Sequence, residues 1–138
     1  INMDITIDQT KKLSEIQAAF SKRFPYLKIE FYNRTHAAGE GSHKENTIDA
    51  HLTIQEVQHK KAEGLLHIQG LMTVAELESG FANTFGLSAQ VFRKSGSIWL
   101  QTTVSDHWTL AEQNQKAMEK HENAEDSAID AMDRMELE

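Results

Sequence analysis

The sequence predicts one α+β domain with a ferredoxin-like βαββαβ arrangement, to which a hairpin strand, a short helix before the third strand and a long C-terminal helix are added. Three observations predict this fold. Strand and helix periods alternate along the chain, a strand–helix–strand pattern occurs twice, and 138 residues with 39% apolar side chains suit a single core. We expect residues 1–108 to form the α+β domain and residues 109–138 an acidic helix, either part of that domain or projecting from it.

The first strand–helix–strand unit covers residues 3–32. Apolar and polar residues alternate at 3–7 and at 26–32, the period of two expected of a strand with one buried face. Between them, apolar residues recur at steps of three and four from Leu13 to Phe24, and Asp8 is placed to cap this helix. Pro25 ends the helix, because proline cannot continue it.

The segment between the two units is a long polar loop followed by a short helix. Residues 33–50 show no period and are rich in glycine and polar residues, which is typical of a loop. Thr53 and Glu56 form a capping box, and this predicts a helix that ends at Gly64. Residues 65–71 then look extended, so they are expected to form the third strand.

The second unit repeats the pattern of the first. Thr73 and Glu76 form another capping box, an apolar stripe runs from Val74 to Phe85, and Gly86 follows where a left-handed C-cap belongs. Alternation at 87–91, a turn at 94–97 and alternation at 98–102 predict a β-hairpin. Two such units sharing one sheet, with both helices on one side, give the ferredoxin-like arrangement.

The C-terminal region is expected to be one helix of up to 29 residues, about 43 Å long at 1.5 Å per residue. Thr109 and Glu112 form a third capping box, and no glycine or proline follows them. Residues 110–138 hold nine acidic and three basic side chains, against twelve and eleven before them. The helix is therefore acidic, and either a solvated tail or a partner-binding element is consistent with its thin apolar stripe.

Composition limits the kinds of site and the cellular compartment that are expected for this protein. The longest apolar run is far shorter than the roughly 20 residues that a membrane span needs, so no membrane contact is expected. The absence of cysteine excludes disulfides, thiolate nucleophiles and sulfur-ligated metal sites. A reducing compartment such as the cytoplasm fits best.

Three stretches carry a resemblance to a known group of proteins: FPYLKIEFY, FGLSAQVFRKSGSIWLQTT and DHWTLAEQN. They resemble a family of small bacterial proteins without an assigned activity. The resemblance spans most of residues 1–108, apart from the polar loop. It implies a bacterial, cytoplasmic protein, and it transfers no catalytic residue to this chain.

Histidines and carboxylates are the candidate catalytic or metal-binding groups of this sequence. Five of the seven histidines fall between positions 36 and 67, but no two stand at the helical spacing that fixes two ligands on one face. Glu76 is explained by its capping box, and no nucleotide-binding or nucleophile motif is present. We therefore expect no catalytic residue, no metal and no cofactor. A metal-dependent enzyme using the His-rich loop 33–51 is the less favoured alternative.

The face of the sheet away from the helices is the predicted binding site. Alternation places aromatic and basic side chains on it, with His67 and Gln90 between them. The anchors and cations are Tyr26, Tyr32, Phe92, Trp99, Lys28 and Lys94. Helices cover only one side of such a sheet, so an aromatic opposite face is expected to be covered or functional.

Three occupants of this face compete: the C-terminal helix, a second copy or other protein partner, and a ligand. We favour a non-enzymatic interaction module that forms a homo-oligomer or binds a protein partner, because aromatic side chains dominate interface energetics. The alternative is single-stranded nucleic acid stacked on the sheet, with phosphate contacts from Arg93, Lys94, Lys60 and Lys61. The net charge of −7 and the missing RNP patterns count against it.

Overall fold

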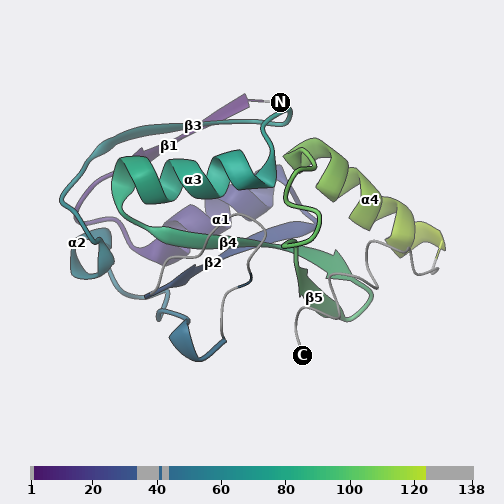
Figure 1. Cartoon of the computed structure of the whole chain (residues 1–138), viewed down its shortest axis with the longest axis horizontal. Helices are drawn as coiled ribbons and strands as arrows, with labels where there is room; N and C mark the ends of the chain where they lie inside the picture. The colour runs from purple at the N-terminus through teal and green to yellow at the C-terminus, as the bar shows by residue number, and fades with distance from the viewer. Residues whose placement is uncertain (1, 34–40, 42–43, 124–138) are drawn as a thin grey trace.

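The part of the chain that the structure describes forms ten short elements, in the order that Figure 1 shows. The structure, a computed structural model, describes residues 2–33, 41 and 44–123. The elements are β1 (Asn2–Ile7), α1 (Leu13–Arg23), β2 (Leu27–Tyr32), the 3₁₀ turn η1 (Lys44–Asn46), α2 (Ile54–Val57), β3 (Gly64–Gln69), α3 (Val74–Phe85), β4 (Ser88–Ser95), β5 (Ile98–Gln101) and α4 (Leu110–Asn123). The predicted α+β class is confirmed. The helix expected beyond residue 123 lies outside the described residues.

The strands form two antiparallel sheets. β1 pairs with β3, and β2 pairs with β4, which also pairs with β5. The predicted ferredoxin-like topology, with every strand in one sheet, is therefore not confirmed. The hairpin of β4 and β5 is present, with Gly96 in its turn at φ 63°. Period two shows which side chains of a strand are buried, but it does not show which strand is the neighbour, and this explains the difference.

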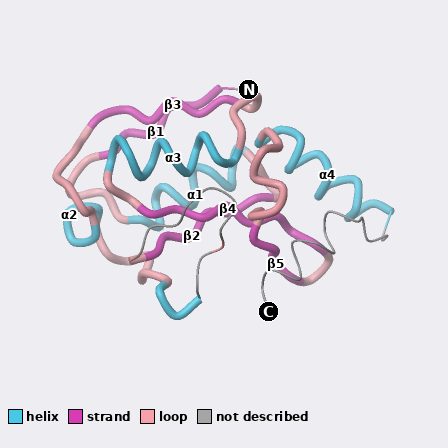
Figure 2. Tube along the Cα trace, in the orientation of Figure 1, coloured by secondary structure: helices cyan, strands magenta, loops and turns pink. Residues whose placement is uncertain are grey.

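Helices α1 and α3 lie between the two sheets in the view of Figure 1, and Figure 2 shows the same arrangement by element type. The buried core combines the apolar stripes of both helices with side chains from both sheets. Its largest fully buried apolar side chains are Phe20, Phe31, Phe81, Phe85, Ile7 and Leu13. Phe31 of β2 meets Phe81 of α3 edge to face at 5.5 Å, so the first unit packs directly against the second.

The internal repeat extends to the way in which helix starts pair. The N–H of Leu13 donates to the carbonyl of Leu52, and the N–H of Val74 donates to that of Trp108. Thus α1 begins against the start of α2, and α3 begins against the start of α4. Both second helices follow the same sequence pattern, His-x-Thr-Ile/Leu-x-Glu, at residues 51–56 and 107–112. Each pairing satisfies N–H groups that a helix start otherwise leaves without an acceptor.

Two helix boundaries differ from prediction. Asp8 does not cap α1, because its carboxylate accepts the N–H groups of Thr10 and Lys11 in a turn before the helix. Lys12 is the N-cap, and the Glu15 carboxylate accepts its N–H at 2.8 Å. The helix predicted to end at Gly64 ends at Val57, where Gln58 takes extended geometry. Both capping boxes in the second unit are present as predicted.

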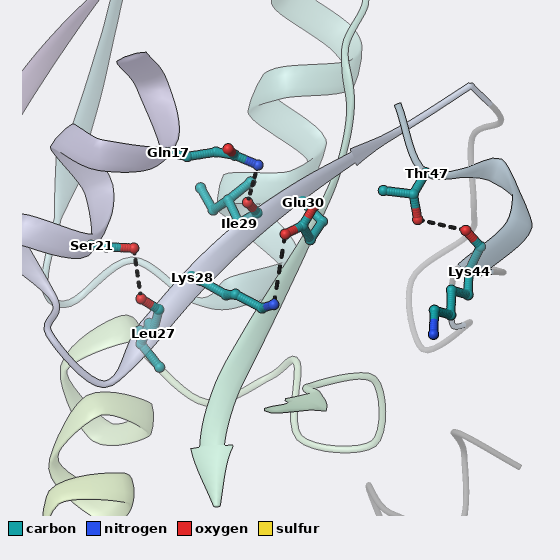
Figure 3. Close-up of polar contacts among 8 residues, drawn as sticks. All are labelled: Gln17, Ser21, Leu27, Lys28, Ile29, Glu30, Lys44 and Thr47. Atoms are coloured by element: carbon teal, nitrogen blue, oxygen red, sulfur yellow. Dashed lines mark hydrogen bonds and ion pairs between the residues drawn. The ribbon is translucent and has the colours of Figure 1, made fainter. Parts of the chain in front are cut away.

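Side chains of α1 bond the backbone groups along the edge of β2 that does not pair with β4. Gln17 donates to the carbonyl of Ile29 at 2.9 Å, and the Ser21 hydroxyl donates to the carbonyl of Leu27 at 3.0 Å (Figure 3). Backbone from the loop that follows β2 adds a further bond, from the N–H of Ile48 to the carbonyl of Phe31. Edge strands with unpaired backbone groups invite association, so this edge is not available to a partner strand.

Helix α4 covers the second half of β4. Arg93 of β4 donates to Gln113 of α4 at 2.6 Å, and Lys120 donates to Ser95. Arg93 and Ser95 project from the same face of β4 as Val91, which belongs to the core. The described part of α4 therefore lies on the helix side of the sheet.

Of the helices among the described residues, none combines the length and apolar composition of a membrane span.

Candidate functional site

The face of the β2–β4–β5 sheet opposite the helices, here called the outer face, brings together five of the six predicted binding residues. Directly opposed residues of antiparallel strands project to the same side. Lys28 opposes Phe92, Tyr32 opposes Ser88, and Lys94 opposes Trp99. The outer face is thus formed by alternate residues of three strands, in the register that their hydrogen bonds set.

The centre of the outer face is a contact between cations and rings. Lys28 Nζ lies 5.2 Å from the ring centroid of Phe92 and 5.1 Å from that of Trp99. Lys94 Nζ lies 5.9 Å from the Trp99 centroid on the neighbouring strand. These separations are within the range in which an ammonium group is attracted to the face of an aromatic ring.

One acidic side chain belongs to the same group. Lys28 Nζ lies 3.6 Å from Glu30 Oε1, and both side chains are drawn in Figure 3. The Lys28 side chain is 31% exposed and that of Glu30 is 27% exposed. Both charges therefore reach solvent, and the ion pair between them is of the weak, partly exposed kind.

Tyr32 and Phe92 are less accessible than an open sheet face implies. Tyr32 is 3% exposed and Phe92 is 8% exposed, whereas Lys94 and Trp99 are half-buried. Burial raises the pKa of Tyr32 to about 12, although a hydrogen bond with Thr47 lowers it in part. A partner approaching the outer face would meet Lys28, Lys94 and Trp99 first, with Phe92 beneath them.

Tyr26, the sixth predicted residue, lies apart from this group and against α4. Its N–H donates to Asn114 Oδ1 at 2.9 Å, and its ring lies 5.7 Å from that of His121. Its carbonyl accepts the N–H of Lys94. Tyr26 therefore links the end of β4 to α4.

Two residues that were assigned to the outer face or to phosphate contact lie elsewhere. His67 belongs to the other sheet, where its Nδ1 lies 2.6 Å from Asp4 Oδ1. Arg93 is 0% exposed and bonds Ser105 as well as Gln113, so it offers no surface for a phosphate. Continued alternation after Val91 indicated this burial of Arg93, because odd-numbered positions of β4 face the helices.

Glu78 of α3 is buried, unlike Glu76, whose carboxylate accepts the N–H of Thr73 at the start of the helix. The Glu78 carboxylate accepts the N–H of Val91 at 2.8 Å, beyond the point where β5 stops pairing. Burial raises the pKa of Glu78 to about 8, the Val91 bond lowers it, and the charge of Asp106 raises it. The sequence did carry a signal: Glu78 stands four residues after Val74, within the apolar stripe of α3.

Gln17 holds the same position in the first unit, four residues after Leu13. Both side chains complete the backbone bonding of the strand that follows their helix. This repetition gives Glu78 a structural role at the edge of β4.

In residues 2–33, 41 and 44–123, no three His, Cys, Asp or Glu side chains come together as metal ligands. His36 and His43, which belong to the predicted loop site, lie outside the described residues. His51 and His59 are exposed, and His51 donates its N–H to Asp49 within a turn.

Comparison with protein-family models gives no match for this chain. Searches of curated proteins and of solved structures give no significant match either.

Proposed function

We propose that this protein is a non-enzymatic interaction module that associates with a second copy of itself through the outer face of the β2–β4–β5 sheet. The observation that supports the proposal is the placement of Lys28 over both Phe92 and Trp99, with Lys94 beside the same indole. A cation held against two rings is an ordered, amphipathic surface before any partner arrives, which lowers the entropic cost of binding.

The composition of this surface suits a protein partner. Tryptophan is among the residues most enriched at binding hot spots, and ordered side chains around it exclude water. The described part of α4 lies on the opposite side of the sheet, since it bonds Arg93 and Ser95. The described part of this helix therefore does not cover the outer face, where Lys28, Lys94 and Trp99 stay partly exposed.

Binding of single-stranded nucleic acid receives less support from the same geometry. Of the four predicted phosphate contacts, Arg93 is buried and Lys60 donates to the carbonyl of Asn83. A cytoplasmic, bacterial setting stays a prediction from the sequence.

Light scattering tests the proposal on the full chain. Wild type should have a mass above the 15.6 kDa of one chain and dissociate on dilution. Trp99→Ala should have the mass of one chain while its circular dichroism stays that of a folded protein. Trp108→Phe, a change at the other tryptophan, should leave the mass as in wild type. A wild type that weighs 15.6 kDa at every concentration would rule out self-association.

A further inference from the structure

Strand β5 is the open edge of the β2–β4–β5 sheet. It pairs with β4 on one side, and at the other end of the sheet the edge of β2 is bonded by Gln17 and Ser21 of α1. Figure 1 shows β5 at the end of this sheet, beyond β4. Its residues, Ile98–Gln101, include no charged side chain and no proline, which commonly protect an edge strand from association. β5 is therefore the place where this sheet can accept a further strand.

The backbone groups of Trp99 point away from β4. The N–H of Lys94 donates to the carbonyl of Tyr26 at 2.9 Å, so the backbone groups of Lys94 face β2 and not β5. Lys94 is the residue opposite Trp99, and opposed residues of an antiparallel pair exchange either both of their hydrogen bonds or neither. The bond from the N–H of Thr102 to the carbonyl of Val91 fits the same alternation. Trp99 therefore directs its N–H and its carbonyl to the open edge.

This edge combines unpaired backbone with exposed apolar side chains. Among residues 2–33, 41 and 44–123, no hydrogen bond is made to the N–H or the carbonyl of Trp99. The neighbouring Ile98 is 42% exposed. The Trp99 side chain is half-buried on the outer face, with Lys28 Nζ 5.1 Å from its ring. Both kinds of group favour the addition of a strand, because the strand would bond the backbone and cover the apolar side chains.

The sequence of β5 is complementary to itself when two copies run antiparallel with Trp99 opposite Trp99. Ile98 of each copy then opposes Leu100 of the other, and Ser97 opposes Gln101, so residues of like polarity meet. The two tryptophans exchange two backbone hydrogen bonds at the centre, because the N–H and the carbonyl of each face the edge. A shift by two residues would instead place Trp99 opposite Ser97 or Gln101. A second copy of the chain therefore matches this edge in hydrogen bonding and in polarity.

We propose that two copies of the chain pair β5 with β5 about a two-fold axis at Trp99, which joins their three-stranded sheets into one antiparallel sheet. The axis is perpendicular to the sheet, so the two outer faces lie on the same side and the two indoles are neighbours on it. The contact requires no movement of Tyr32 or Phe92, which are buried. This inference rests on the proposed self-association, because it specifies how the second copy contacts the Trp99 end of the outer face.

Amide hydrogen exchange of wild type, measured by NMR, tests the backbone pairing. In the dimer, the N–H of Trp99 should exchange at least about tenfold more slowly than in the diluted monomer, because it becomes hydrogen-bonded. The N–H of Leu100 is the internal control. Leu100 opposes Arg93, whose backbone groups face β5, so its N–H is bonded within one chain and should be equally protected in both states.

Ile98→Lys tests the edge while Trp99 stays in place. A lysine on an edge strand opposes strand addition because its charge must keep its water, so the dimer dissociation constant should rise at least about tenfold. Circular dichroism should stay that of a folded protein. Leu65→Lys is the matched control, since it changes an exposed aliphatic residue of an edge strand in the other sheet. It should leave the constant as in wild type.

The outcomes separate the edge pairing from the self-association. If wild type dimerises and Trp99→Ala is monomeric, but the N–H of Trp99 exchanges equally fast in dimer and monomer, the self-association stands and the edge pairing is wrong. A dimer of Ile98→Lys that is as tight as that of wild type would also overturn the edge pairing, as would an equal loss of affinity in Leu65→Lys. If wild type is monomeric at every concentration, both proposals fail.

Discussion

The N–H of Val91 in β4 donates a 2.8 Å hydrogen bond to Glu78 Oε2 of α3, so a buried carboxyl group completes a strand edge that β5 leaves open. Glu78 is 6% exposed, and burial raises its pKa to about 8. The folded protein therefore holds a proton here at neutral pH that the unfolded chain has released. Stability must depend on pH through this one group.

Glu78→Gln tests this linkage. The pKa of Glu78 is raised from 4.5 to about 8 on folding, so the free energy of unfolding of the wild type falls as pH rises from about 4.5 to about 8. Glutamine keeps an oxygen acceptor for Val91 without an ionisable proton. We expect the variant to match wild type within about 1 kcal/mol at pH 5 and to exceed it by roughly 1–4 kcal/mol at pH 8.5.

Urea unfolding at both pH values measures this difference. Glu119→Gln, at an exposed position of α4, is the matched control and should show no such growth with pH. A difference between Glu78→Gln and wild type that is equal at pH 5 and pH 8.5 would show that Glu78 is ionised in the folded protein throughout.

Alanine substitution at two glycines with left-handed backbone distinguishes the free-energy cost of a steric clash from that of backbone strain. Gly86 has φ 65° and Gly96 has φ 63°. A Cβ at Gly86 would lie 2.8 Å from the backbone nitrogen of Lys60, whereas a Cβ at Gly96 would meet no atom within 4 Å. Gly96→Ala should cost about 1–2 kcal/mol of stability through backbone strain alone. Gly86→Ala should cost about 1–3 kcal/mol more, because the loop at Lys60 must move. Equal losses in chemical denaturation would contradict this reading of the Gly86 contact.

Replacing threonine by alanine should lower stability at the N-caps of α3 and α4 and raise it inside α3. The hydroxyls of Thr73 and Thr109 each accept an N–H three residues on, at 3.1 and 3.0 Å. Thr73→Ala and Thr109→Ala should each lower the free energy of unfolding by about 1 kcal/mol. Thr84→Ala, at an exposed position inside α3, should raise it by a few tenths of a kcal/mol, because alanine has the higher helix propensity. A thermal scan of the three variants checks the signs, and a stabilising Thr109→Ala would show that this cap contributes nothing.

Local patterns predicted the elements of the second unit well. The capping box at Thr73, the stripe to Phe85 and the left-handed Gly86 all stand where the sequence placed them. These features depend on neighbours a few residues away, so a linear pattern contains them. Asp8 was misread for a different reason. The first N–H groups of α1 bond the carbonyls of Ala50 and Leu52, which are distant in sequence, so no side-chain cap was needed at that point.

The sequence did not predict which strands pair or which sheet faces are covered. Alternation placed Lys28 and Phe92 on one face correctly, yet it did not show that β2 pairs with β4 outside the β1–β3 sheet. It also did not show that Tyr32 would be buried, because period two distinguishes two faces and says nothing about what covers either of them. Tyr26 was assigned to the outer face although it precedes β2 and packs beside α4, through contacts 88 residues apart in sequence.

The indole signals of Trp99 and Trp108 in the isotope-labelled wild type test the central claim most directly. Trp99 lies on the outer face within 5.1 Å of Lys28 Nζ, and Trp108 lies at the paired starts of α3 and α4. We predict that dilution from dimer to monomer shifts the Trp99 signal and leaves the Trp108 signal unchanged. A shift confined to Trp108, or no shift of Trp99 while the mass falls to that of one chain, would place the interface elsewhere and contradict the account.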